Sequence, residues 1–189
     1  MDKRTPSRSF RIAQTCFHDP DMATLTPPRP STADDDRRSF DCGRESLNLW
    51  FQRHALRNQE SSLSRTNVIC DAATGAIAGY VSLSAAQIER AHLPKSAQRN
   101  RPDPVPALLL GQLAVDKSYQ GRGCAASLML FALKTAVRFA QEVGCFCVLT
   151  HPLDDGVRAF YARFGFETLP FDPKRAMVVR MVELEHNGF

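Results

Sequence analysis

Hydrophobic and polar residues follow two different periods along this chain, and the periods predict a mixed series of helices and strands. Leu47, Trp50, Phe51 and Ala55 recur at helical spacing and would form one buried stripe of a helix. Two apolar segments, 67–71 and 76–86, flank the turn AATG and predict a β-hairpin. Beyond them, the pattern predicts a strand at 105–116, a helix at 128–143, a buried strand at 145–151, a helix from near 154 to 165 and a final strand at 176–184.

This order of elements predicts one α/β domain in which helices pack on a mixed sheet. The strand at 105–116 is apolar on both faces, which is typical of a central strand. Residues 1–36 are polar and rich in proline, as in TPPRPSTADDD, and this composition is typical of a linker or a poorly ordered tail. We therefore expect a tail at 1–36 and the folded domain at 37–189. The basic, proline-interrupted segment 88–104 predicts a loop or a short broken helix.

Composition narrows the class of protein without identifying a function. No apolar run approaches the roughly 20 residues of a membrane span, and the first 20 residues show no secretory signal, so we expect a cytoplasmic protein without a membrane partner. The net charge of +4 is compatible with a polyanionic partner. The six cysteines lack paired ligand spacing, so we expect free thiols and no metal. Cys145 and Cys147 would share one face of a strand and belong to the core.

The stretch QGRGCAASLML, residues 120–130, places two glycines and an arginine between a strand and a helix. A helix N-terminus exposes unpaired N–H groups and the positive end of the helix dipole. Gly121 and Gly123 would let the backbone approach an anion closely, and Arg122 adds positive charge. The stretch is therefore either a cradle for a phosphate or pyrophosphate, or a tight turn with glycines for steric reasons. The spacing alone leaves both interpretations open.

The same stretch also satisfies the G-x-G-x-x-A pattern of dinucleotide-binding folds, but its surroundings argue against that class. Residues 116–120 separate the strand from the first glycine, and Glu142 precedes the next strand instead of ending it. About 65 residues remain after the motif, which is too few for a doubly wound sheet.

Several motifs in the same order resemble one known family. The stretch QGRGCA matches the Q/R-x-x-G-x-G/A signature of GNAT-fold N-acetyltransferases, and the preceding LGQLAVD and the later FYARFGF match as well. The resemblance is closest to the toxin acetyltransferases that modify charged tRNA and are encoded beside a ribbon-helix-helix antitoxin. FDCGRESLNLWF, NQESSLSRTNVIC, RNRPDPVPALLLGQLAVD and GVRAFYARFGF carry it, over roughly residues 39–185.

The resemblance implies a GNAT fold with two splayed parallel strands and a site for acetyl-CoA. The cradle amides would bind the pyrophosphate, the edge of the strand at 105–116 would pair with the pantetheine arm, and 145–150 would be the splayed partner. The chain departs from the branch at Gln112, where arginine is frequent, and at Cys124 and Ala125, where Leu-Gly is frequent. The implied cofactor residues are Leu113, Ala114 and Val115 on the strand and Gln120, Gly121, Arg122, Gly123, Cys124 and Ala125 in the cradle.

By the same resemblance, Tyr161 is the tyrosine that protonates the departing CoA thiolate. Attack of an amine on a thioester expels a thiolate, and a hydroxyl donor held at the sulfur lowers that barrier. Without the family context, Tyr161 reads as a half-buried helix tyrosine beside Phe160 and Phe164.

The residues also bear on the substrate. The stretch LLLGQLAVD has no glutamate to act as a base, which suits an aminoacyl α-amine, with a pKa of about 7.7 to 8, better than a lysine at about 10.4. Cationic groups for tRNA phosphates cluster in one loop region. These candidate tRNA-binding residues are Arg90, Lys95, Arg99 and Arg101.

The favoured function is acetylation of the α-amine of aminoacyl-tRNA by acetyl-CoA, which blocks translation. The resemblance implies aminoacyl-tRNA and a ribbon-helix-helix antitoxin as partners, and a homodimer. The first alternative is a GNAT enzyme that acetylates a small amine or a protein N-terminus. The second is an anion-binding module that has kept the fold without catalysis.

Overall fold

The computed structural model describes residues 25–189, so most of the predicted tail lies outside the described residues. The described chain divides into two compact units. We call residues 25–84 and 110–132 the first unit, and residues 85–109 and 133–189 the second unit.

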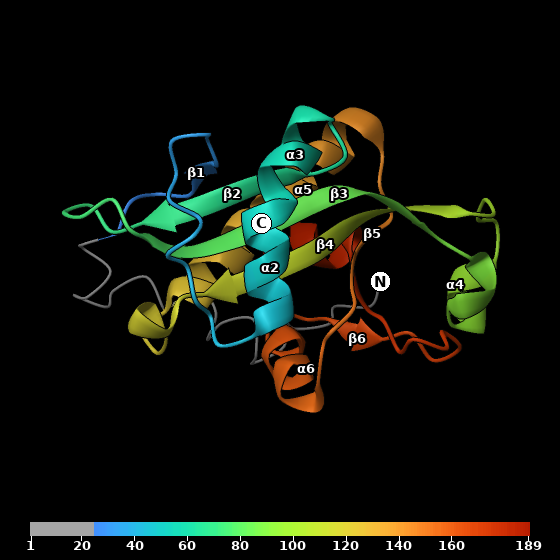
Figure 1. The fold of residues 1–189 in the computed structure, drawn as a ribbon. Coiled ribbons are helices and arrows are strands. Elements are labelled where there is room, and N and C mark those ends of the chain that lie inside the picture. The colour runs from blue at the N-terminus through green and yellow to red at the C-terminus, as the bar shows by residue number, and fades with distance from the viewer. Residues whose placement is uncertain (1–24) are drawn as a thin grey trace. The chain divides into compact units, whose positions relative to one another are not determined.

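Within residues 25–189, seven strands are hydrogen-bonded in the order β1-β2-β3-β4-β5-β7-β6. Figure 1 labels β1 to β6. β4 and β5 run parallel, whereas the pairs β1–β2, β2–β3, β5–β7 and β6–β7 are antiparallel. The predicted mixed α/β fold is therefore confirmed. The strands are β1 (Arg29–Pro30), β2 (Arg65–Cys70), β3 (Ile77–Ile88), β4 (Val105–Val115), β5 (Cys147–Thr150), β6 (Glu167–Thr168) and β7 (Met177–Arg180).

The helices follow the predicted order with some differences at their ends. The first predicted helix is divided at His54, and the segment predicted as a loop or broken helix contains two short helical turns. No helix of residues 25–189 combines the length and the apolar character that a bilayer crossing requires. The helices are α2 (Glu45–Arg53), α3 (Ala55–Glu60), α4 (Lys95–Gln98), α5 (Cys124–Val143), α6 (Asp155–Ala162) and α7 (Met181–His186), with 3-10 turns η3 (Arg90–His92) and η4 (Lys117–Tyr119).

An aromatic cluster forms the core of the first unit. The rings of Phe51 and Tyr80 stack with centroids 4.1 Å apart, and Phe40 meets both rings edge-on. The Tyr80 hydroxyl donates a hydrogen bond of 2.9 Å to the Leu47 carbonyl, so this buried polar group is satisfied. These contacts fix α2 against β3 through the stripe that the helical spacing predicts.

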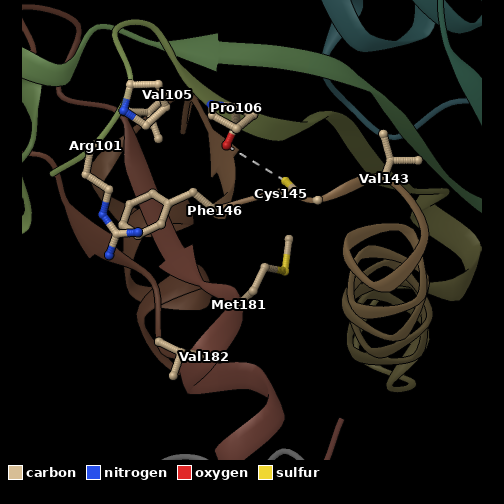
Figure 2. A pocket seen from close by; sticks show the side chains of 10 residues that line it. Arg101, Val105, Pro106, Val143, Cys145, Phe146, Met181 and Val182 are labelled. Atoms are coloured by element: carbon tan, nitrogen blue, oxygen red, sulfur yellow. Dashed lines mark hydrogen bonds between the residues drawn. The ribbon is translucent and has the colours of Figure 1, made fainter.

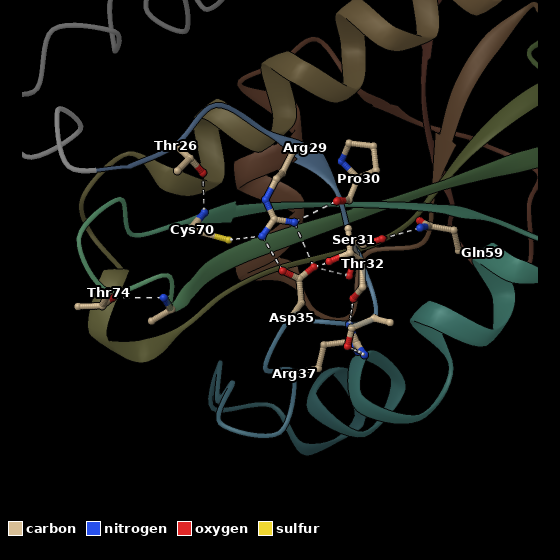
Figure 3. Close-up of polar contacts among 12 residues, drawn as sticks. Thr26, Arg29, Pro30, Ser31, Thr32, Asp35, Arg37, Gln59, Cys70 and Thr74 are labelled. Atoms are coloured by element: carbon tan, nitrogen blue, oxygen red, sulfur yellow. Dashed lines mark hydrogen bonds and ion pairs between the residues drawn. The ribbon is translucent and has the colours of Figure 1, made fainter.

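Part of the predicted tail is joined to the sheet of the first unit. Arg29 in β1 binds the Asp35 carboxylate, and its Nη2 also lies 3.3 Å from the Cys70 thiol (Figure 3). The Ser31 hydroxyl donates to Asp35 at 3.0 Å. Residues 25–36 are therefore built into the fold, and the polar composition that suggested a tail instead supplies one ion-pair network.

The end of the chain differs from its prediction, and the difference has a local cause. The strand expected at 176–184 ends at Arg180, and α7 begins at Met181. The Arg180 N–H donates to the Glu183 carboxylate at 3.3 Å, and the Arg180 side chain binds the same group. This contact of the Glu183 carboxylate with the N-cap N–H, the glutamate half of a capping box, starts a helix inside an apolar run whose alternation was compatible with a strand. The strand prediction is wrong beyond Arg180.

Candidate functional site

The glycine motif connects η4 to α5 in the first unit. Gly121 has a φ of +79° and Gly123 a φ of +77°, a left-handed conformation that glycine adopts without steric cost. A Cβ on Gly121 would meet no other atom within 4 Å. Backbone conformation, and not a crowded neighbour, therefore requires glycine here, and the space in front of this backbone is open to a ligand.

Helix α5 begins immediately after the second glycine, four residues earlier than predicted. The first hydrogen bond of this helix runs from the Ser127 N–H to the Gly123 carbonyl at 3.1 Å. Helix geometry consequently leaves the N–H groups of residues 123–126 without acceptors inside the helix. These N–H groups and the positive end of the helix dipole can bind an anionic oxygen.

The side chain of Gln120 holds the glycine turn and the start of α5 in place; we call these residues, 120–126, the cradle. Its Nε2 donates to the carbonyl of Val115 at 3.0 Å and to that of Cys42 at 3.1 Å. Asp116 caps η4 through the Ser118 N–H at 2.9 Å and also accepts the Asp41 N–H at 2.8 Å. The glutamine of the motif thus joins the cradle to the end of β4, which explains why this residue type is needed beside the glycines.

The cysteine in the motif points away from the open side of the cradle. Cys124 is 1% exposed, and burial raises the pKa of its thiol to about 12. A Cβ at Gly79 on β3 would lie 3.2 Å from this sulfur and 2.9 Å from the Ala114 carbonyl oxygen. Gly79 therefore allows α5 to pack closely on the sheet, and Cys124 offers only its backbone to a ligand.

The predicted pantetheine strand is the last part of β4. Pairing with β5 runs from Ala107 to Leu109, where Leu109 faces Leu149. β5 ends at Thr150, whereas β4 continues to Val115. The parallel ladder thus stops well before β4 ends, so Leu113, Ala114 and Val115 lie beyond it.

Tyr161 lies on α6 in the second unit, and its environment keeps the phenol protonated. The residue is 5% exposed, and burial raises the pKa of its hydroxyl, while a hydrogen bond with Thr150 acts in the opposite direction. The rings of Phe160 and Phe166 contact the Tyr161 ring edge-on, with ring centroids 5.6 and 5.4 Å from the centroid of Tyr161. The side chain of Asp154 caps α6 by accepting the Val157 N–H at 2.9 Å. The arrangement fits a rigidly held proton donor.

The four predicted tRNA-binding residues lie in one segment of the second unit but in different environments. Arg90 interacts with other residues of the same segment: it donates to the Arg101 carbonyl at 2.9 Å and forms an ion pair with Asp103 at 3.7 Å. The Arg101 guanidinium lies over the Phe146 ring, 4.3 Å from its centroid. Lys95 and Arg99 are exposed. Lys95 and Arg99 are therefore the cations of this set that are best placed for phosphate contacts.

A groove of about 480 Å³ lies beside Arg101 (Figure 2). Its wall includes the exposed side chains of Val143 and Val182. Cys145 also lines it and donates to the Cys147 carbonyl at 3.3 Å. Contrary to prediction, β5 begins at Cys147, so Cys145 precedes the strand and only Cys147 is fully buried. Within residues 25–189 the cysteines are free, and no cluster of three His, Cys, Asp or Glu side chains could hold a metal ion.

Two residues that support the candidate site, Gly79 and Thr150, could not be predicted from the sequence. Gly79 has no motif around it, and its role appears only when β3 is packed against Cys124. Thr150 ends a buried strand, and only the fold brings it to the hydroxyl of Tyr161. A small residue within a strand and a polar residue at a strand end are the weak signals that mark them.

Comparisons with known proteins agree with this geometry. The acetyltransferase (GNAT) domain family matches residues 64–168. A tRNA-acetylating toxin of Mycobacterium tuberculosis (strain ATCC 25618 / H37Rv) is 37% identical over 158 residues, which cover 84% of this chain and 94% of the relative. AtaT complexed with acetyl-methionyl-tRNAfMet is 32% identical, with a TM-score of 0.79 over 86% of this chain and 98% of that chain.

A further solved structure holds a mutant AtaT toxin bound to the C-terminus of the antitoxin AtaR and acetyl-CoA. It is 27% identical, with a TM-score of 0.73 over 86% of this chain and 97% of that chain. The resemblance predicted from the motifs is confirmed by the family match and by the toxin relative. The chain belongs to the GNAT acetyltransferases, in the branch that contains the tRNA-acetylating toxins.

Proposed function

We propose that this acetyl-CoA-dependent N-acetyltransferase acetylates the α-amine of aminoacyl-tRNA and so blocks translation. The observation that carries the proposal is 37% identity to a tRNA-acetylating toxin over nearly the whole of that relative. An acetylated α-amine cannot act as the acceptor in peptide transfer, so translation would stop at the modified tRNA.

The backbone of the first unit suits the diphosphate of acetyl-CoA, which supplies the acetyl group as a thioester. Gly121 and Gly123 adopt left-handed conformations before α5, and the N–H groups of its first turn have no acceptors inside the helix. Residues 113–115 continue β4 beyond its pairing with β5 and would pair with the amide groups of the pantetheine arm. These features support the assignment of the nine cofactor residues predicted from the resemblance.

Tyr161 would supply the proton that the reaction needs. The free α-amine attacks the thioester carbonyl, a C–N bond forms, the C–S bond breaks, and the phenol gives its proton to the departing thiolate. The proton that the attacking nitrogen loses restores the phenol, so the products are the acetylated amine and the CoA thiol. Burial keeps the phenol in its acid form. β4 offers no carboxylate as a base, which suits an α-amine that is already substantially unprotonated near neutral pH.

Mass spectrometry of charged tRNA tests this function directly. After incubation of a charged tRNA pool with the protein and acetyl-CoA, we expect aminoacyl groups that are heavier by one acetyl group. The Tyr161→Phe variant serves as the control with the fold retained. Acetylation of peptides or small amines, with charged tRNA left unmodified, would contradict the tRNA assignment and favour the alternative substrate class.

The exposed cations of segment 88–104, Lys95 and Arg99, are proposed to contact tRNA phosphates. We expect the double variant Lys95→Gln, Arg99→Gln to weaken tRNA binding most at low salt and to reduce the magnitude of the slope of log K against log salt by about two, because each cation releases about one counterion. Filter binding over a salt series measures both. The matched control, Lys134→Gln with Arg138→Gln on α5, removes the same charge and should leave the slope unchanged. An unchanged slope in the first variant would remove the segment from the interface.

Two partner assignments accompany this proposal. A ribbon-helix-helix antitoxin and a homodimeric assembly follow from the branch that the sequence resembles. The solved complex of AtaT with the C-terminus of AtaR supports an antitoxin partner for this chain.

A further inference from the structure

Arg122, in the middle of the cradle, has a defined position. Its guanidinium lies over the ring of Tyr119, 5.6 Å from the ring centroid. A guanidinium within about 6 Å of an aromatic ring is attracted to the face of that ring. The side chain of Arg122 therefore turns toward η4, which precedes the cradle, while the cradle amides belong to the start of α5.

The ring beneath Arg122 is itself fixed. The Tyr119 hydroxyl donates to Asp71 Oδ2 at 3.3 Å. The other carboxylate oxygen of Asp71 accepts the N–H groups of Ala73 and Thr74, both at 2.9 Å. Both oxygens of Asp71 are thus engaged, and the aspartate orients Tyr119 instead of pairing with Arg122.

Arg122 is also the cation of the cradle that no described carboxylate neutralises. Lys117, in the preceding turn, pairs with Asp41 at 2.7 Å. Arg122 is exposed, and no described residue forms an ion pair with it. A guanidinium that is oriented by an aromatic ring and lacks a carboxylate partner is prepared to bind a phosphate.

Acetyl-CoA carries two phosphorylated groups, a diphosphate and a phosphate on the 3′ position of its ribose. The backbone N–H groups at the start of α5 are proposed to bind the diphosphate, and the Arg122 guanidinium lies over the ring of Tyr119 in η4. We propose that Arg122, positioned by Tyr119, binds the 3′-phosphate and makes the enzyme discriminate acetyl-CoA from its 3′-dephospho form. This inference rests on the proposed placement of acetyl-CoA in the cradle.

Calorimetric titration with acetyl-CoA and with acetyl-3′-dephospho-CoA tests the assignment. The wild type should bind acetyl-CoA about 10-fold more tightly than the dephospho compound, because one charge-assisted phosphate contact is lost. Arg122→Gln should bind both compounds equally, with its affinity for the dephospho compound unchanged. Lys117→Gln, which makes the same charge change in the preceding turn, should keep the wild-type preference.

Variants of Tyr119 test whether its ring positions the Arg122 guanidinium, because they leave the charge of Arg122 unchanged. Tyr119→Phe keeps the ring and should keep most of the preference, whereas Tyr119→Leu should lose part of it with unchanged affinity for the dephospho compound. An equal loss of both affinities in Arg122→Gln would assign the arginine to the diphosphate and overturn the inference, and so would no loss at all. If the wild type bound neither compound, the cradle assignment itself would fail, and the inference with it.

Discussion

Replacement of Tyr161 by phenylalanine is expected to lower kcat by about 100-fold or more and to leave the Kd for acetyl-CoA nearly unchanged. The variant keeps the edge-on contacts with Phe160 and Phe166 and loses only the hydroxyl that would protonate the thiolate. Release of the CoA thiol measures turnover, and calorimetry measures binding. Full activity would remove Tyr161 from the mechanism.

The pH profile provides a second readout for the same residue. A proton donor works only while it is protonated, and burial raises the pKa of Tyr161 above the ordinary value of about 10. Deprotonation of Tyr161 should therefore cause no loss of activity at any pH below about 10.

A different buried tyrosine gives the control for loss of a hydroxyl group. The Tyr80 hydroxyl binds the Leu47 carbonyl in the core of the first unit. Tyr80→Phe should lower the free energy of unfolding by about 1 kcal/mol, since it removes this buried hydrogen bond, while kcat stays near the wild-type value. An equal fall in kcat for both variants would indicate a structural effect.

The sequence predicts the backbone of the glycine motif well because its signals are local. Positive φ at Gly121 and Gly123, and a helix directly after them, follow from residue type and order along the chain. Asp154 as a helix cap and Gly165 at a helix end, with a φ of +82°, are equally local features. Motif, turn and cap are each encoded within a few residues, so no knowledge of the tertiary fold is needed to predict them.

Features that depend on distant residues could not be predicted in this way. β1 is two residues long, and its place beside β2 depends on contacts of Arg29 with Asp35 and Cys70. The charge of Arg90 suggested a phosphate contact, but its partner Asp103 becomes its neighbour only when the loop closes. Charge along a sequence shows where cations are, whereas the fold decides which of them are already paired.

Substitution of Gly123 by glutamate is expected to weaken acetyl-CoA binding by about 100-fold or more. The side chain would place a negative charge among the N–H groups at the start of α5, where the diphosphate is proposed to lie, and repulsion between like charges costs several kcal/mol. The left-handed φ of +77° adds a conformational cost of about 1–2 kcal/mol to folding. Calorimetry gives the affinity, and chemical denaturation gives the loss of stability.

Gly144 at the other end of α5 separates these two effects. It has a φ of +81°, and a Cβ there would meet no atom within 4 Å, so Gly144→Glu adds the same charge and similar strain. Its N–H donates to the Ala140 carbonyl at 3.0 Å and ends the helix, where the dipole offers no site for an anion. We therefore expect Gly144→Glu to lose at least as much stability as Gly123→Glu, because its charge lies at the negative end of the helix dipole, and only Gly123→Glu to lose affinity for acetyl-CoA. Equal affinities of the two variants for acetyl-CoA would show that acetyl-CoA does not bind through the cradle, because a carboxylate in the cradle would repel a bound diphosphate.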